Sequence, residues 1–95
     1  MTTKQISDHR KDIPDWSIYA NILHRTFKFI GFLDSVNFVK QIAPKAQKLN
    51  HHPDIDIRFD KVSLILTTHD EGGIIEKDFA LAKQCDAVFA KSFAP

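Results

Sequence analysis

The sequence has 95 residues, which is enough for one domain and too few for two typical ones. With 43% hydrophobic and 26% charged residues, and a glycine and proline content of only 3 and 4, it is typical of a globular chain and not of a disordered one. A formal net charge of +1, with acids and bases interspersed, gives no basic surface of the kind that nucleic acid or an anionic membrane requires.

The single cysteine, Cys85, excludes an intramolecular disulfide. The polar N-terminal sequence MTTKQISDHRKD contains no apolar core of the kind found in signal peptides. No apolar run approaches the roughly 18 residues that indicate a membrane span. We therefore expect a cytoplasmic protein with neither a membrane nor a nucleic acid as partner.

The first third of the chain predicts a β-hairpin after a polar segment. Residues 1–13 are mostly polar and predict either a weakly ordered segment or a short helix. Trp16 and Ile18 alternate with polar residues, and after a turn near Asn21 the alternation continues through residues 23–29. A period of two indicates strands with one apolar face.

A helix is predicted over about residues 32–49, because apolar residues recur there at spacings of three and four. We expect its core side to consist of Phe32, Val36, Val39, Ala43 and Ala46. Pro44 lies inside this helix, where its ring clashes with the carbonyl four residues earlier, so we expect a kink.

A second hairpin is predicted next, with a turn at residues 60–61 between two alternating segments. Its apolar side is expected to contain Ile55, Ile57 and Phe59 on the first strand and Val62, Leu64 and Leu66 on the second. Two one-sided hairpins with a helix between them predict an α+β fold, a single domain with a four-stranded antiparallel sheet and helices packed on one face.

The last predicted helix, residues 75–93, carries two neighbouring apolar seams in place of one narrow stripe. One explanation is a broad face that packs entirely within the chain. The other is that part of this surface contacts another subunit, because large apolar patches mark interfaces. We expect a homo-oligomer, a dimer or a tetramer, formed through this helix and a sheet edge.

Three of the five histidines flank the second hairpin. His51 and His52 precede Pro53, and His69 follows the last strand, so antiparallel pairing brings all three to one end of the sheet. A zinc site needs three converging nitrogens, which the adjacent residues His51 and His52 provide only if the loop at Pro53 twists them together. Proton transfer requires less, because an imidazole with a pKa near 6.5 gives and takes protons at neutral pH. Asp78, in the first turn of the last helix, either offsets the helix dipole or belongs to this site.

Residues 46–82, AQKLNHHPDIDIRFDKVSLILTTHDEGGIIEKDFALA, resemble the pterin-4a-carbinolamine dehydratases, and the likeness extends upstream through RTFKF at 25–29 and covers about residues 16–90. The resemblance implies a small α+β fold and the dehydration of 4a-hydroxytetrahydropterin to quinonoid dihydropterin, without a metal or organic cofactor. It also implies a link to tetrahydrobiopterin recycling, since an aromatic amino acid hydroxylase produces this carbinolamine.

The resemblance implies three catalytic histidines, His51, His52 and His69. It further implies that the substrate lies near Asp78, Gln47, Asn50, Pro53 and Thr68. The chain departs from the family where Gln47 and Asn50 replace frequent acids and where Ile75 replaces a Ser or Thr that caps the last helix. Some relatives serve as a dimerisation cofactor of a transcription factor, so a non-catalytic dimerisation or binding module of the same fold is the alternative.

Overall fold

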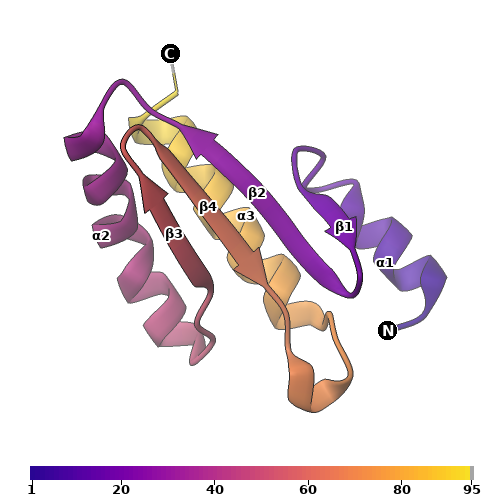
Figure 1. The fold of residues 1–95 in the computed structure, drawn as a ribbon. Coiled ribbons are helices and arrows are strands. Elements are labelled where there is room, and N and C mark those ends of the chain that lie inside the picture. The colour runs from indigo at the N-terminus through magenta and orange to yellow at the C-terminus, as the bar shows by residue number, and fades with distance from the viewer. Residues whose placement is uncertain (95) are drawn as a thin grey trace.

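The computed structural model describes residues 1–94 (Figure 1). Its elements, in chain order, are α1 (Thr3–Arg10), β1 (Ser17–Tyr19), β2 (Ile22–Lys28), α2 (Phe32–Leu49), β3 (Asp54–Arg58), β4 (Lys61–Leu66), the short 3₁₀ helix η1 (His69–Glu71) and α3 (Glu76–Ser92). No helix among residues 1–94 combines the length and the apolar character needed to cross a membrane.

The four strands form one antiparallel sheet in the order β1-β2-β4-β3, so the two predicted hairpins are joined by the pairing of β2 with β4. Helix α3 crosses behind this sheet, and α2 lies beside α3 near β3 (Figure 1). The apolar face of β2 and β4 is fully buried beneath the helices at Leu23, Phe27, Val62, Leu64 and Leu66. The predicted α+β fold with a four-stranded antiparallel sheet is confirmed.

The N-terminal segment forms a short helix. The Thr2 side chain accepts a hydrogen bond from the Gln5 backbone, and the Gln5 side chain accepts one from the Thr2 backbone, which together make a capping box. The ring of His9 stacks on Phe79 of α3 at 4.9 Å between centroids. Ile13, just after the helix, is completely buried in the core. The segment is therefore attached to the domain by its C-terminal end.

The turn of the second hairpin lies one residue earlier than predicted. Arg58 pairs with Lys61, so the two turn residues are Phe59 and Asp60. Phe59 has a φ of 53°, a left-handed conformation that a bulky residue rarely adopts. The expectation that it continues the strand face of Ile55 and Ile57 is wrong, because the positive φ turns the chain there.

Helix α2 has the predicted bounds and runs without interruption through Pro44, but the predicted core side is wrong. Its buried residues are Ser35, Phe38, Ile42 and Ala46. Of the predicted stripe only Ala46 is buried; Phe32 and Ala43 are exposed, and Val36 and Val39 are half-buried. Both stripes have helical spacing, and packing against α3 selects the one that faces the core. We call Phe32, Val36, Val39 and Ala43 the second stripe of α2.

The broad apolar surface of α3 is used within the chain. Phe79, Leu81, Ala82, Cys85 and Val88 are all buried, because α3 packs against the sheet and also against α2. Among the described residues, no large apolar side chain of α3 is exposed. Burial inside the domain thus accounts for the two seams.

A polar network joins α3 to strand β2 and to Trp16. Asp86 accepts hydrogen bonds from Trp16 Nε1 at 2.8 Å and from Arg25 Nη1 at 2.7 Å. Arg25 also packs over the ring of Phe27, with 4.2 Å between the guanidinium carbon and the ring centroid. Burial raises the pKa of Asp86 above its ordinary value of 3.8, and the Trp16 and Arg25 interactions only partly oppose this.

The raised pKa of Asp86 predicts a pH-dependent contribution to stability. The folded chain binds a proton at Asp86 more readily than the unfolded chain does, so this group adds stability as the pH falls through its folded pKa toward 3.8. The free energy of unfolding of the wild type, minus that of Asp86→Asn, should therefore increase over this range. Urea denaturation at a series of pH values measures it, and a difference that shrinks on acidification would contradict the assignment.

A side chain at position 73 should lower the stability of the fold. Gly73 has a φ of 132°, and a Cβ at this position would lie 2.9 Å from Cβ of Asn21. Gly73→Ala should lower the free energy of unfolding by about 1–3 kcal/mol through backbone strain and this contact. Gly31→Ser is the matched control, because Gly31 has open space around it and Ser is a favourable N-cap. Equal stability of the two variants in urea denaturation would show that the close approach does not matter.

Candidate functional site

The C-terminus of α2 positions the first histidine. Asn50 adopts a left-handed conformation, φ 51° and ψ 45°, and its backbone N–H bonds to carbonyls of the last helical turn. The N–H of His51 then donates to the carbonyl of Ala46 at 3.0 Å. Asparagine tolerates this conformation better than most residues, so it ends the helix here and reverses the chain. The reversal directs His51 toward the start of α3.

Asp78 is the centre of the site. Its side chain is 0% exposed and accepts three hydrogen bonds, from His51 Nε2, from Thr68 Oγ1 at 3.0 Å and from the Ile75 N–H at 2.8 Å. The last of these bonds is half of a capping box; Ile75 has no side-chain acceptor to complete it. The carboxylate thus ties together the segments before β3, after β4 and at the start of α3.

These bonds define which nitrogen of His51 is available. An ionised carboxylate only accepts hydrogen bonds, so Nε2 of His51 carries the proton toward Asp78 and Nδ1 is left without one in the neutral ring. The His51 side chain is 11% exposed, which leaves a small part of the ring open to a ligand. A carboxylate behind an imidazole stabilises positive charge on the ring, so this pair is suited to accept and hold a proton.

His52 has a different environment. It is exposed, and its Nε2 donates to the side-chain carbonyl of Gln47 at 2.9 Å. The partner of His52 is therefore a neutral amide in this chain. The amide orients the ring without the electrostatic stabilisation that a carboxylate would give to an imidazolium.

The loop after β4 brings the remaining residues to the same end of the sheet. Thr68 and Gly73 exchange backbone hydrogen bonds at 2.9 and 3.0 Å, which closes the loop that contains η1. His69 begins η1 and is exposed, and within residues 1–94 its side chain makes no hydrogen bond. It therefore lies next to Thr68 in the chain without being bonded to His51 or His52.

The structure connects some of the predicted site residues by hydrogen bonds and leaves others outside these connections. Hydrogen bonds connect His51, Asp78 and Thr68 in one cluster and His52 with Gln47 in a second one. Asn50 acts through its backbone as a helix cap, and half-buried Pro53 leads from the histidines into β3. Among residues 1–94, no group of three or more His, Cys, Asp or Glu side chains is arranged to hold a metal ion.

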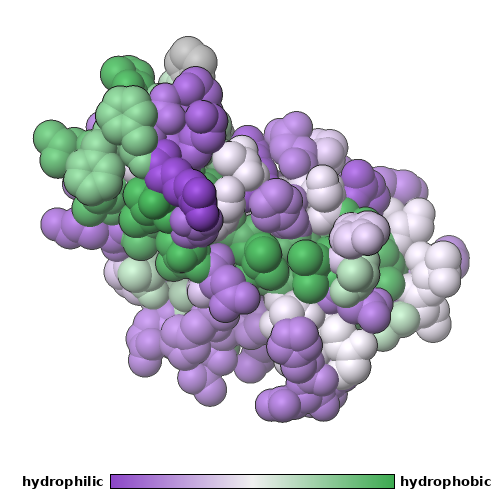
Figure 2. Space-filling model, in the orientation of Figure 1, coloured by the Kyte–Doolittle hydropathy of each residue, from purple (hydrophilic) through white to green (hydrophobic). Residues whose placement is uncertain are grey.

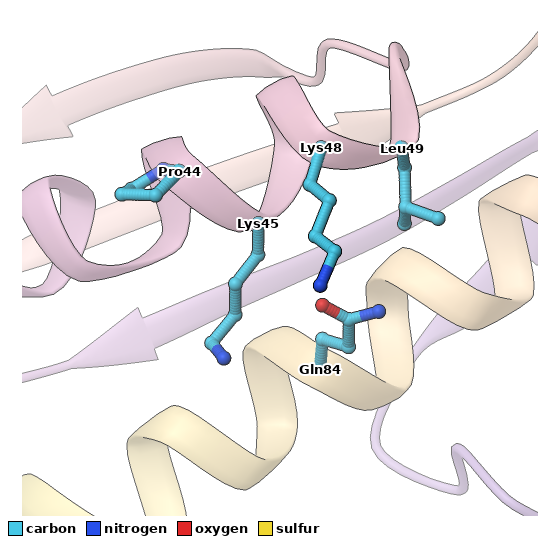
Figure 3. Close-up of a pocket in the computed structure, with 5 residues that line it drawn as sticks. All are labelled: Pro44, Lys45, Lys48, Leu49 and Gln84. Carbon is cyan, nitrogen blue, oxygen red and sulfur yellow. The ribbon is translucent and has the colours of Figure 1, made fainter.

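One hollow was not anticipated from the sequence. A groove of about 490 Å³ runs between α2 and α3 and is lined by Pro44, Lys45, Lys48, Leu49 and Gln84 (Figure 3). The spacing of three between its lysines was the only available signal, and surface lysines commonly have this spacing on helices. Buried Cys85 is not a candidate nucleophile, because burial raises the pKa of its thiol to about 12.

Comparisons with known proteins identify the family of the chain. The model of the pterin 4 alpha carbinolamine dehydratase family matches residues 1–88. A provisionally named pterin-4-alpha-carbinolamine dehydratase of Chloroflexus aurantiacus is 44% identical over 88 residues, which cover 93% of this chain and 95% of that protein. One of Sulfolobus acidocaldarius, with the same provisional name, is 47% identical over 77 residues, 81% of this chain and 85% of that one.

Two solved structures have the same fold. A transcriptional coactivator/pterin dehydratase from Brucella melitensis superposes with a TM-score of 0.87 at 29% identity, covering 93% of this chain and 96% of the other. A pterin dehydratase-like protein, identified as a RuBisCO assembly factor in the alpha-carboxysome, has a TM-score of 0.63 at 22% identity over 77% and 84% of the two chains. The family model and the closely similar relatives show that the chain belongs to the pterin-4-alpha-carbinolamine dehydratase family.

Proposed function

We propose that this protein dehydrates 4a-hydroxytetrahydropterin to quinonoid dihydropterin by histidine general acid/base catalysis. The observation that carries this proposal is the His51–Asp78 pair, in which a fully buried carboxylate holds one nitrogen of a slightly exposed imidazole. The Thr68 hydroxyl and the Ile75 N–H fix the second oxygen of that carboxylate. The pair is therefore preorganised to hold a proton at a defined place.

The reaction needs two proton movements. The C4a–O bond breaks as the departing hydroxyl gains a proton and leaves as water, while the N5–H bond breaks and a double bond forms between C4a and N5. His51 is suited to take the N5 proton at Nδ1, because Asp78 stabilises the resulting imidazolium. His52 and His69 are exposed at the same end of the sheet and are suited to protonate the leaving hydroxyl.

The proposed partners follow from this activity. The substrate is a small pterin, and an aromatic amino acid hydroxylase is the class of enzyme that supplies it. In this scheme the chain acts in tetrahydropterin recycling in the cytoplasm, without a resident cofactor. Self-association remains part of the proposal, with the β3 edge of the sheet as its surface, because the apolar residues of α3 are buried within the chain.

The first prediction concerns turnover by the purified protein. The wild type should accelerate carbinolamine dehydration, and His51→Ala should lower kcat by about 10²–10⁴-fold through loss of the proton acceptor. His24→Ala is the matched control, because His24 alternates with buried Leu23 in β2 and so lies on the face of the sheet away from α3, and it should keep the wild-type rate. Absence of turnover by the wild type would favour the binding module, and an unchanged rate in His51→Ala would exclude the proposed role of this ring.

The second prediction concerns the partner of His52. Gln47→Glu should place a carboxylate on Nε2 of His52 in place of the amide, which favours the protonated ring. If His52 protonates the leaving hydroxyl, activity should persist to higher pH in this variant, and the alkaline limb of the kcat profile should move upward. The profile of His52→Ala should lose this limb. A Gln47→Glu profile identical to that of the wild type would remove His52 from the acid role.

A further inference from the structure

The groove between α2 and α3 lies apart from the histidine site. It is lined by Pro44, Lys45, Lys48 and Leu49 from the last two turns of α2 and by Gln84 from α3 (Figure 3). Gln47, which bonds to His52, projects about 200° around the helix from Lys45. The groove and the histidines therefore occupy different sides of α2. Its volume of about 490 Å³ is in the range of pockets that bind small molecules.

Two ammonium groups extend into this groove without an acidic partner. Figure 3 shows the side chains of Lys45 and Lys48 reaching from α2 toward α3, with that of Lys48 pointing toward the Gln84 amide. None of the ion pairs within residues 1–94 includes either lysine. The sequence also has no acidic residue between Asp34 and Asp54. The α2 side of the groove is thus positively charged and has no counter-charge on its own helix.

Helix α3 adds positive charge to the opposite side. Lys77 and Lys91 are exposed, and each lies seven residues from Gln84, so both share its face of the helix. Glu76 is eight residues from Gln84, about 12 Å along the helix axis. Asp86 is directed elsewhere, because it accepts hydrogen bonds from Trp16 and from Arg25 of the sheet. An anion in the groove would therefore meet lysines on both helices.

The ordinary roles of lysine explain only part of this arrangement. Lys48 lies in the last turn of α2 and offsets the helix dipole there, but this effect declines beyond that turn and leaves Lys45 unexplained. Burial and the charge of Asp86 raise the pKa of the Cys85 thiol to about 12, and the charge of Lys45 acts in the opposite direction. The ammonium group of Lys45 is therefore held close to α3.

The exposed apolar surface lies at the other end of the molecule. Ile30, Phe32, Leu33 and Phe59 are exposed where β2 leads into α2 and β3 leads into β4. Figure 2 shows apolar surface, in green, gathered at the upper left, where α2 begins, and mostly hydrophilic surface at the lower left, where α2 ends. The groove thus lies at the charged end of α2, which suits a charged small molecule better than an apolar protein surface.

We propose that the groove between α2 and α3 binds a small organic phosphate. The phosphate group lies between Lys45 and Lys48, which bind it as point charges, and the Gln84 amide donates to one of its oxygens. The organic part lies against half-buried Leu49 and the ring of Pro44, because a groove of this volume is larger than a phosphate ion. This binding site does not depend on the proposed function.

Titration of the isotope-labelled protein tests the site, with amide chemical shifts as the readout and ionic strength held constant with NaCl. Phenyl phosphate should shift the amides of Lys45, Lys48, Leu49 and Gln84 with a Kd of about 1 mM or lower. Inorganic phosphate should shift the same amides with an affinity about fivefold or more weaker, because it buries no apolar surface. Phenol, which lacks the phosphate group, should bind about tenfold or more weakly than phenyl phosphate.

Charge-removing variants test the two lysines. Lys45→Gln and Lys48→Gln should each weaken the binding of phenyl phosphate by about fivefold. Lys40→Gln is the matched control, because it removes the same charge from an exposed position of the same helix outside the groove, and it should keep the wild-type affinity. All three variants should unfold in urea as the wild type does, since the substituted side chains are exposed.

The remaining outcomes count against the proposal. Shifts that do not saturate up to about 20 mM phenyl phosphate, or shifts confined to the histidine residues, would show that the groove does not bind this ligand. Equal weakening by Lys40→Gln would reduce the effect to general attraction by a basic surface. Equal affinities for phenyl phosphate and inorganic phosphate would overturn the organic part of the assignment, and equal affinities for phenyl phosphate and phenol would overturn the role of the lysines.

Discussion

The buried carboxylate of Asp78 is the constraint on which the arrangement of this end of the molecule depends. An ionised side chain with no solvent exposure costs several kcal/mol unless hydrogen bonds replace its water. Its three donors come from the segment before β3, the segment after β4 and the first residue before α3. All three segments must therefore close on Asp78 for the chain to fold at low cost, and the closure places His51 in a fixed orientation. Stability and the geometry of the site have the same origin here.

The strands could be predicted because each has one buried face, which leaves a period of two in the sequence. Turn positions were harder, because a turn without glycine gives little local signal. Asn21 is a residue that tolerates a positive φ, and the predicted turn there is correct, whereas the positive φ of Phe59 contradicts its ordinary preference and moved the second turn by one residue. Residue preferences therefore predict a turn correctly only where the turn residue adopts a backbone conformation that it normally tolerates.

The candidate site was only partly predictable from its residues. Antiparallel pairing alone brings His51 and His69 to one end of the sheet, and the helix start brings Asp78 there. Which ring bonds to the carboxylate depends on the left-handed cap at Asn50, whose effect on direction no spacing rule contains. The hydroxyl of Thr68 likewise points to Asp78 because of the loop closed with Gly73. Such contacts are three-dimensional consequences of turns, and periodicity carries no information on them.

The error in the core side of α2 has a physical meaning. Helical periodicity shows that a face avoids water, but it does not show which surface covers that face. On α2 the stripe through Phe38 and Ile42 is covered by the domain itself, whereas the second stripe, which begins at Phe32, is half-buried or exposed. The domain buries both seams of α3, which contacts the sheet and α2, but it leaves most of the second stripe of α2 half-buried or exposed. The number of elements that surround a helix, and not the period of its apolar residues, therefore decides which of two equally periodic stripes is buried.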